Sequence, residues 1–110
     1  DARTPANRRK LDAVESLALL SEEAGMPLVK LALAFVITHA AVTAAIVGPR
    51  TMAQLESALP AADVVLPTEI LDRIDEIVPP GVTINPADTS YGADELAPAA
   101  RRRALADRGD

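Results

Sequence analysis

The stretch Thr43-Ala-Ala-Ile-Val-Gly-Pro-Arg-Thr-Met-Ala-Gln-Leu-Glu56 decides the fold. It begins with a short apolar run, Thr43 to Gly48, which contains β-branched residues and ends at Gly48-Pro49. Runs of this kind are typical of fully buried strands in parallel sheets. A buried strand needs hydrogen-bonding neighbours. We therefore expect the rest of the sheet to come from a weak partner at 82–84, from an oligomer, or from sequence upstream of Asp1.

Helix signals precede and follow this strand. Apolar residues at three- and four-residue steps, together with capping residues, predict four helices over about residues 8–24, 27–39, 52–59 and 66–78. The first is expected to have Asn7 as its N-cap and to end at Gly25. The second is apolar nearly all round, with Lys30 as its only charged residue, so we expect it to be buried between other elements. The third opens with the capping-box residues Thr51 and Gln54.

Helical periodicity disappears from Gly81 onward, and the sequence ends in a segment that contains three consecutive arginines. We expect a mobile tail over about residues 92–110. Because the chain begins with Asp1 rather than Met, we also expect it to be part of a longer protein.

Composition narrows the function further. The 110 residues suit one compact domain, and the lack of cysteine excludes disulfides and cysteine-based metal sites and favours the cytoplasm as the compartment. The formal charge of −5 disfavours a nucleic-acid partner. The longest apolar run, Leu31 to Ile37, is far shorter than the roughly 18 to 20 residues that cross a bilayer, so no membrane role is predicted.

An anion site is predicted where the strand meets the third helix. Free N–H groups and the positive end of the helix dipole favour a phosphate at the start of a helix. Gly48 permits close approach to the backbone, and Arg50 carries a fork of donors suited to a phosphate dianion. Simpler interpretations remain open: Arg50 is also explained as a solvated loop residue, and Gln54 as a capping residue alone.

The other residues of chemical interest give weaker signals. His39, the sole histidine, falls in the last turn of the apolar helix, where a structural role at the helix end is favoured. Tyr91 has the chemistry of a general acid but lies in the predicted tail without a lysine nearby in sequence. No histidine or carboxylate cluster with metal-ligand spacing is found, so no metal site is predicted.

Three stretches taken together, Leu31-Ala-Leu-Ala-Phe-Val36, residues 43–56 and Leu66 through Asn85, resemble the C-terminal third of an aldo-keto reductase. The resemblance runs in one register from about residue 5 to residue 91. It implies an α/β fold in which residues 1–91 are the C-terminal portion of a (β/α)₈ TIM barrel, with 44–47 as the eighth strand. On its own the chain would be mostly helical, with about four helices and one strand.

The resemblance also implies a cofactor. Aldo-keto reductases hold NADPH extended, without a Rossmann fold, and transfer hydride between it and an aldehyde or ketone. By position, Gly48, Arg50 and Gln54 match the family's contacts to the 2′-phosphate side of the cofactor. The family usually has Glu and Asn where this chain has Ser57 and Ala58, which removes two adenine contacts and bears on the preference for NADPH over NADH.

The family's catalytic Asp, Tyr, Lys and His come from the first half of the barrel, and no segment of this chain resembles that half. We therefore expect the chain to be inactive alone and to need the missing N-terminal barrel segment or another chain. Two other hypotheses remain: a small helical interaction module that pairs through the apolar helix Pro27 to His39, and a truncation without a function of its own.

Overall fold

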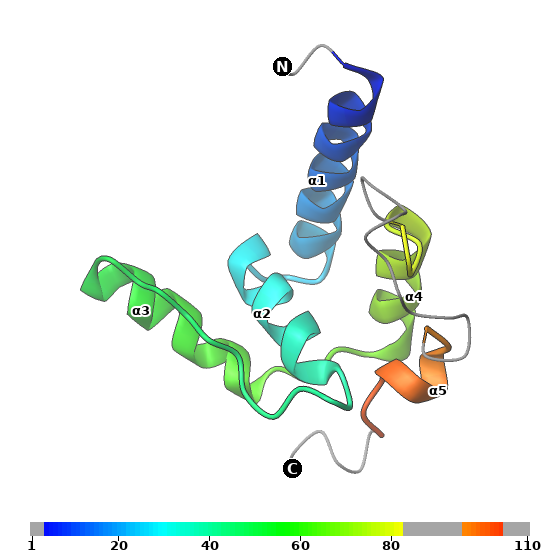
Figure 1. Ribbon diagram of the computed structural model, residues 1–110. Coiled ribbons are helices and arrows are strands. Elements are labelled where there is room, and N and C mark those ends of the chain that lie inside the picture. Colours follow the sequence, from blue (N-terminus) through cyan, green and yellow to red (C-terminus); the bar gives the residue numbers. More distant parts are fainter. Residues whose placement is uncertain (1–3, 83–95, 105–110) are drawn as a thin grey trace.

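The computed structural model describes residues 4–82 and 96–104. In chain order its elements are α1 (Pro5–Glu23), α2 (Leu28–Thr38), α3 (Met52–Ala58), the 3₁₀ helix η1 (Leu59–Asp63), α4 (Thr68–Ile77) and α5 (Pro98–Arg101). Figure 1 shows α2 at the centre, with α3 on one side and α4 and α5 on the other. Helix α2 packs against α1, α3 and η1, and α4 packs against α1.

The four helices expected from the sequence all form, with small shifts at their ends. Helix α1 begins earlier than predicted because Thr4, rather than Asn7, is its N-cap: the Thr4 Oγ1 accepts a hydrogen bond from the Asn7 N–H at 3.4 Å. Pro5 occupies the first turn, where its missing N–H costs nothing. The prediction that α1 ends at Gly25 is confirmed, since Gly25 has a φ of 71°, the left-handed conformation that favours glycine.

The core is a small cluster between α1, α2 and α4. Its buried residues are Leu20, Leu31, Ala34, Leu66, Leu71 and Ile74. Two buried hydroxyls are satisfied within their own helices: Ser21 donates to the carbonyl of Ala18 at 2.7 Å and Thr38 to that of Ala34 at 2.6 Å. The stability of the described fold therefore depends on few side chains.

Helix α2 is not buried on all sides, and the expectation that it would be is wrong for this chain. Leu31, Ala34 and Thr38 face the core. On other faces Val29, Phe35 and Val36 remain 46%, 38% and 42% exposed. The physical reason is that the elements described over residues 4–82 and 96–104 cover these faces only in part.

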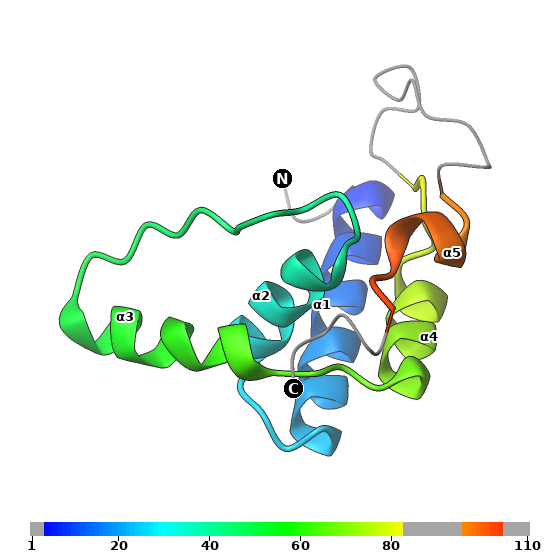
Figure 2. The ribbon, with the colours of Figure 1, turned by 90° about the horizontal axis from the view of Figure 1, so that it is seen from below.

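The strand predicted in the run 43–48, with 44–47 as its centre, is not formed. The segment is an extended connection between α2 and α3, which Figure 2 shows running to the far end of α3. Residues 43–49 donate and accept no backbone hydrogen bond with any described residue, and the side chain of Ile46 is fully exposed. A strand exists only with a ladder partner. Of the possible partner at 82–84, Val82 is exposed, and the other two residues lie outside the described part.

A segment near the C-terminus adds contacts that the sequence analysis did not predict. Residues 96–104 include α5 and three consecutive arginines, Arg101–Arg103, which we call the arginine strap. Arg101 and Arg102 form ion pairs with Asp75 on α4, at 2.8 and 2.7 Å. An isolated antiparallel bridge joins Arg102 to His39. The expected mobile tail over 92–110 stays a prediction elsewhere, because 92–95 and 105–110 lie outside the described residues.

Acid is expected to loosen the contact between Asp75 and the strap. Burial raises the pKa of the Asp75 carboxyl, but hydrogen bonds and charge from Arg101 and Arg102 outweigh this effect and hold the pKa below its ordinary value of 3.8. Because the folded-state pKa is lowered, the stabilisation is present above the unfolded-state pKa and is lost as the pH falls through the folded-state pKa. We expect the free energy of unfolding to fall by about 1 kcal/mol as the pH falls from above the unfolded-state pKa of Asp75 to below its folded-state pKa.

Urea unfolding followed by circular dichroism at several pH values between neutrality and strong acid measures this loss. The Asp75→Asn variant removes the titrating group, so it should lack this part of the acid dependence. An identical acid profile in the variant and the unaltered chain would show that the pairing does not contribute.

Candidate functional site

The corner between the extended segment and α3 contains the three site residues predicted from the sequence, which are Gly48, Arg50 and Gln54. Thr51 is the N-cap of α3, and its Oγ1 accepts a hydrogen bond from the Gln54 N–H at 3.2 Å. The Gln54 Oε1 accepts in return from the N–H of Arg50 at 2.8 Å, one residue before the N-cap. The expected capping pair is confirmed, with this shift of one residue. Gln54 therefore ties the loop at Arg50 to the first turn of α3.

Several hydrogen-bond donors at this corner are open. The Arg50 residue is exposed, and no carboxylate of the described residues lies within ion-pairing distance of its guanidinium. The N–H groups of Met52 and Ala53 have no hydrogen-bond acceptor within the described part of the chain. The first N–H groups of a helix carry its positive dipole end. A cation beside such donors suits an anionic group.

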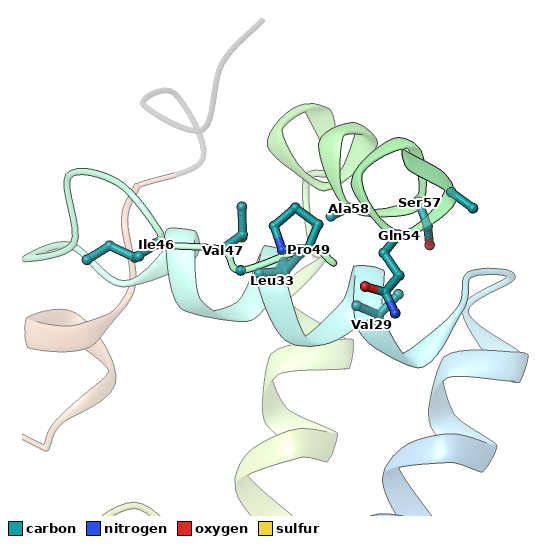
Figure 3. Close-up of a pocket in the computed structure, with 10 residues that line it drawn as sticks. Val29, Leu33, Ile46, Val47, Pro49, Gln54, Ser57 and Ala58 are labelled. Carbon is teal, nitrogen blue, oxygen red and sulfur yellow. The ribbon is translucent and has the colours of Figure 1, made fainter. Parts of the chain in front are cut away.

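An apolar depression of about 650 Å³ lies next to this corner, between α2 and α3. Figure 3 shows Gln54 and Ser57 extending from α3 towards Val29 of α2, with Leu33 and Pro49 beside them. Gly48 also lines the depression, whereas Arg50 does not, although it directly follows Pro49. The structure therefore brings Gly48 and Gln54 to one hollow and leaves Arg50 outside its lining.

The apolar lining from α2 was not identified as part of a site from the sequence. Val29 and Leu33 lie four residues apart, so they fall on the same face of α2. A second apolar depression adjoins the first and shares Leu33, Val47 and Ala58 with it. The signal that could have revealed this surface is the excess of apolar residues on α2, which we attributed wholly to burial.

The remaining candidates have structural roles or lie outside the described residues. His39 is the C-cap of α2, and its Nδ1 accepts a hydrogen bond from the Ala41 N–H at 3.1 Å. This contact agrees with the structural role favoured for His39. Tyr91 is outside the described part of the chain. Within residues 4–82 and 96–104, no group of three or more histidine and carboxylate side chains could hold a metal ion.

Comparison with known proteins identifies the family. The sequence model described as "Aldo/keto reductase family" matches residues 1–79. The chain therefore belongs to the aldo/keto reductase family. A curated relative, the uncharacterized oxidoreductase YrpG of Bacillus subtilis (strain 168), is 38% identical over 66 residues, which are 60% of this chain and 20% of the relative. The match thus spans about a fifth of the relative's length. No solved structure matches significantly.

Membership of the family also indicates the fold class. It implies that the chain is a fragment of a TIM barrel, in which helices surround a closed parallel sheet. The described residues of this fragment are mostly helical, and none of them forms a strand. Separately, no helix among the described residues is both long enough and apolar enough to span a membrane.

Proposed function

We propose that the chain is the C-terminal portion of an NADP-dependent aldo/keto reductase and binds the adenosine 2′-phosphate end of NADPH at residues 48–54. Bound NADPH supplies hydride to an aldehyde or ketone. The observation that carries the proposal is the juxtaposition of exposed Arg50, the open N–H groups of Met52 and Ala53, and the apolar depression beside them. The arginine and the N–H groups suit a phosphate, and the apolar depression suits the adenine ring.

Each residue has a distinct role in this proposal. The Arg50 guanidinium pairs with the 2′-phosphate through two parallel N–H donors. Gly48 leaves its backbone open to the ligand, since a Cβ placed there would meet no atom of the described residues within 4 Å. Gln54 contributes through its side-chain N–H₂ group, because its Oε1 already accepts from Arg50. Ser57 and Ala58 replace acidic and amide residues usual in the family, so adenine is held mainly by apolar contact.

The proposed role is binding without catalysis. The family's catalytic Asp, Tyr, Lys and His have no matching segment in this sequence, so we propose that the chain alone does not reduce a carbonyl. The carbonyl substrate then belongs to the longer protein. We place that protein in the cytoplasm because the 110 residues of this chain contain no cysteine. The family match favours this role over an interaction module derived from a barrel segment.

The test compares two nucleotides on the 110-residue chain. Adenosine 2′,5′-bisphosphate carries the distinguishing phosphate, and adenosine 5′-monophosphate lacks it. We expect the bisphosphate to bind about tenfold or more tightly, because charge-assisted hydrogen bonds to a phosphate contribute about 1.5 to 3 kcal/mol. Heteronuclear NMR titration measures both affinities and shows whether the shifted amides lie at 48–54. Equal affinities would contradict the proposal.

Gly48→Ala provides a matched probe in the same titration. Its φ is outside the left-handed region and the added methyl meets no described atom within 4 Å, so the melting temperature should stay unchanged. A phosphate lying against this backbone would meet the new methyl, and bisphosphate binding should weaken several-fold. Unaltered binding would remove Gly48 from the site while leaving the role of Arg50 to be judged separately.

A further inference from the structure

Within the described part of the chain, the extended segment 43–49 is held by backbone hydrogen bonds only at the residues that flank its two ends. Its backbone forms no hydrogen bond with the described residues, so no ladder holds it along its length. At its C-terminal end, the Arg50 N–H is tied to Gln54. At its N-terminal end lies the turn 38–42, in which the Val42 N–H donates to the His39 carbonyl at 3.0 Å. Whatever fixes this turn also fixes the direction in which the segment leaves α2.

The arginine strap holds the turn through three hydrogen bonds. The Arg103 N–H donates to the Thr38 carbonyl at 2.9 Å, and the Ala40 N–H donates to the Arg101 carbonyl at 2.8 Å. These two bonds form a short antiparallel pairing between 38–40 and 101–103. The Arg103 Nη2 then donates to the carbonyl of Val42 at 2.9 Å. This side-chain bond reaches the last residue before the extended segment.

Helix α4 in turn holds the strap. Asp75 accepts from both nitrogens at the end of the Arg101 guanidinium, at 3.3 and 2.8 Å, and from Arg102 at 2.7 Å. Asp72 accepts from the other terminal nitrogen of Arg102 at 2.8 Å. The side chains of Arg101, Arg102 and Asp75 are only 11%, 14% and 19% exposed. Ion pairs that are largely shielded from water are screened less by salt than exposed pairs.

We propose that Arg103 is a positioning residue, and that the arginine strap anchored on Asp75 fixes the path of the segment that carries Gly48 to the α3 corner. The consequence for cofactor binding rests on the function proposed above. The consequence for the path of the segment does not, because it follows from the contacts alone. The two are therefore measured separately.

The experiment is a distance measurement between two spin labels on the full chain. The chain has no cysteine, so labels attach only where cysteines are introduced. We place them at Ser16→Cys on exposed α1 and at Ile46→Cys, whose native side chain is fully exposed. Double electron–electron resonance gives the distance distribution. We expect Arg103→Ala and Asp75→Asn each to make the distribution about twofold broader. Arg103→Ala removes the side-chain bond that reaches Val42, and Asp75→Asn weakens the hold of α4 on the strap.

Controls separate positioning from general stability. Arg73→Ala breaks another ion pair of α4, the one to Glu23 at 3.0 Å, and should leave the distribution unchanged. Arg103→Lys keeps a donor for the Val42 carbonyl and should preserve the narrow distribution. Circular dichroism at the labelling temperature verifies that the helices persist in each variant. If Asp75→Asn lowers the helicity, only the distance distribution of Arg103→Ala is used to test the positioning role, because this variant leaves the α4 carboxylates intact.

The outcomes are distinct. A distribution that is already broad in the unaltered chain, or that stays unchanged in Arg103→Ala, overturns the proposal. Broadening in Arg103→Ala but not in Arg103→Lys or Arg73→Ala supports it. A parallel titration with adenosine 2′,5′-bisphosphate tests the link to function, and we expect Arg103→Ala to weaken binding about threefold. Broadening without any bisphosphate binding would leave the positioning role in place and contradict the proposed function.

Discussion

The Arg50→Ala variant is expected to bind adenosine 2′,5′-bisphosphate about ten- to a hundredfold more weakly than the unaltered chain. The reason is the loss of the charge-assisted hydrogen bonds that a guanidinium forms with a phosphate dianion. Binding of adenosine 5′-monophosphate should change little, because it lacks the 2′-phosphate. Isothermal titration calorimetry with both nucleotides measures the difference. Since Arg50 is exposed, the variant should keep its melting temperature.

Arg9→Ala is the matched control for this prediction. Arg9 is an exposed arginine on α1, so its removal changes the net charge equally without touching the α3 corner. An equal loss of affinity in the two variants would show that the effect is one of overall charge. In a longer protein that contains the rest of the barrel, Arg50→Ala should weaken NADPH more than NADH. Equal weakening of both cofactors would contradict the role assigned to Arg50.

Leu20→Ala is expected to unfold a large fraction of the chain at 25 °C. Truncation of a fully buried leucine costs about 2 to 5 kcal/mol, and small domains have only about 5 to 15 kcal/mol of total stability. Leu20 is 0% exposed at the centre of a small core, so little else can compensate. Urea titration followed by far-ultraviolet circular dichroism measures the loss.

The neighbouring Leu19→Ala makes the same chemical change outside the core. Leu19 belongs to the same helix but is 57% exposed, so this variant should lose less than about 0.5 kcal/mol. Similar losses in the two variants would mean that the packing between α1, α2 and α4 does not stabilise the chain in solution.

The helices could be predicted because their signals are local. The Thr51 cap acts within one turn of its helix, and Gly25 ends α1 through its own backbone conformation. The strand could not be predicted in the same way, because a strand depends on partners distant in sequence. The apolar run at 43–47 carries a preference for burial that the described residues do not satisfy. The exposed apolar faces of α2 also prefer burial, and the described residues do not provide it.

Long-range contacts set the limit of prediction at the site as well. The local pattern predicted that a helix begins just after Arg50, and α3 begins at Met52. The binding roles of Gly48, Arg50 and Gln54 stay predictions. The pattern did not predict that Val29 and Leu33 of α2 would line the adjoining hollow. Nor did it predict that Arg101 and Arg102 would pair with α4, since the outward position of Asp72 and Asp75 on a helix indicates only a solvated face.

The hydrogen bond between Arg103 and Val42 joins residues 61 positions apart. Closing so long a loop has an entropic cost that only neighbouring contacts can offset. We therefore expect α1, α2 and α4 to pack together before this connection forms. On heating we expect the order to reverse, so that the arginine strap leaves the turn 38–42 before the helices melt.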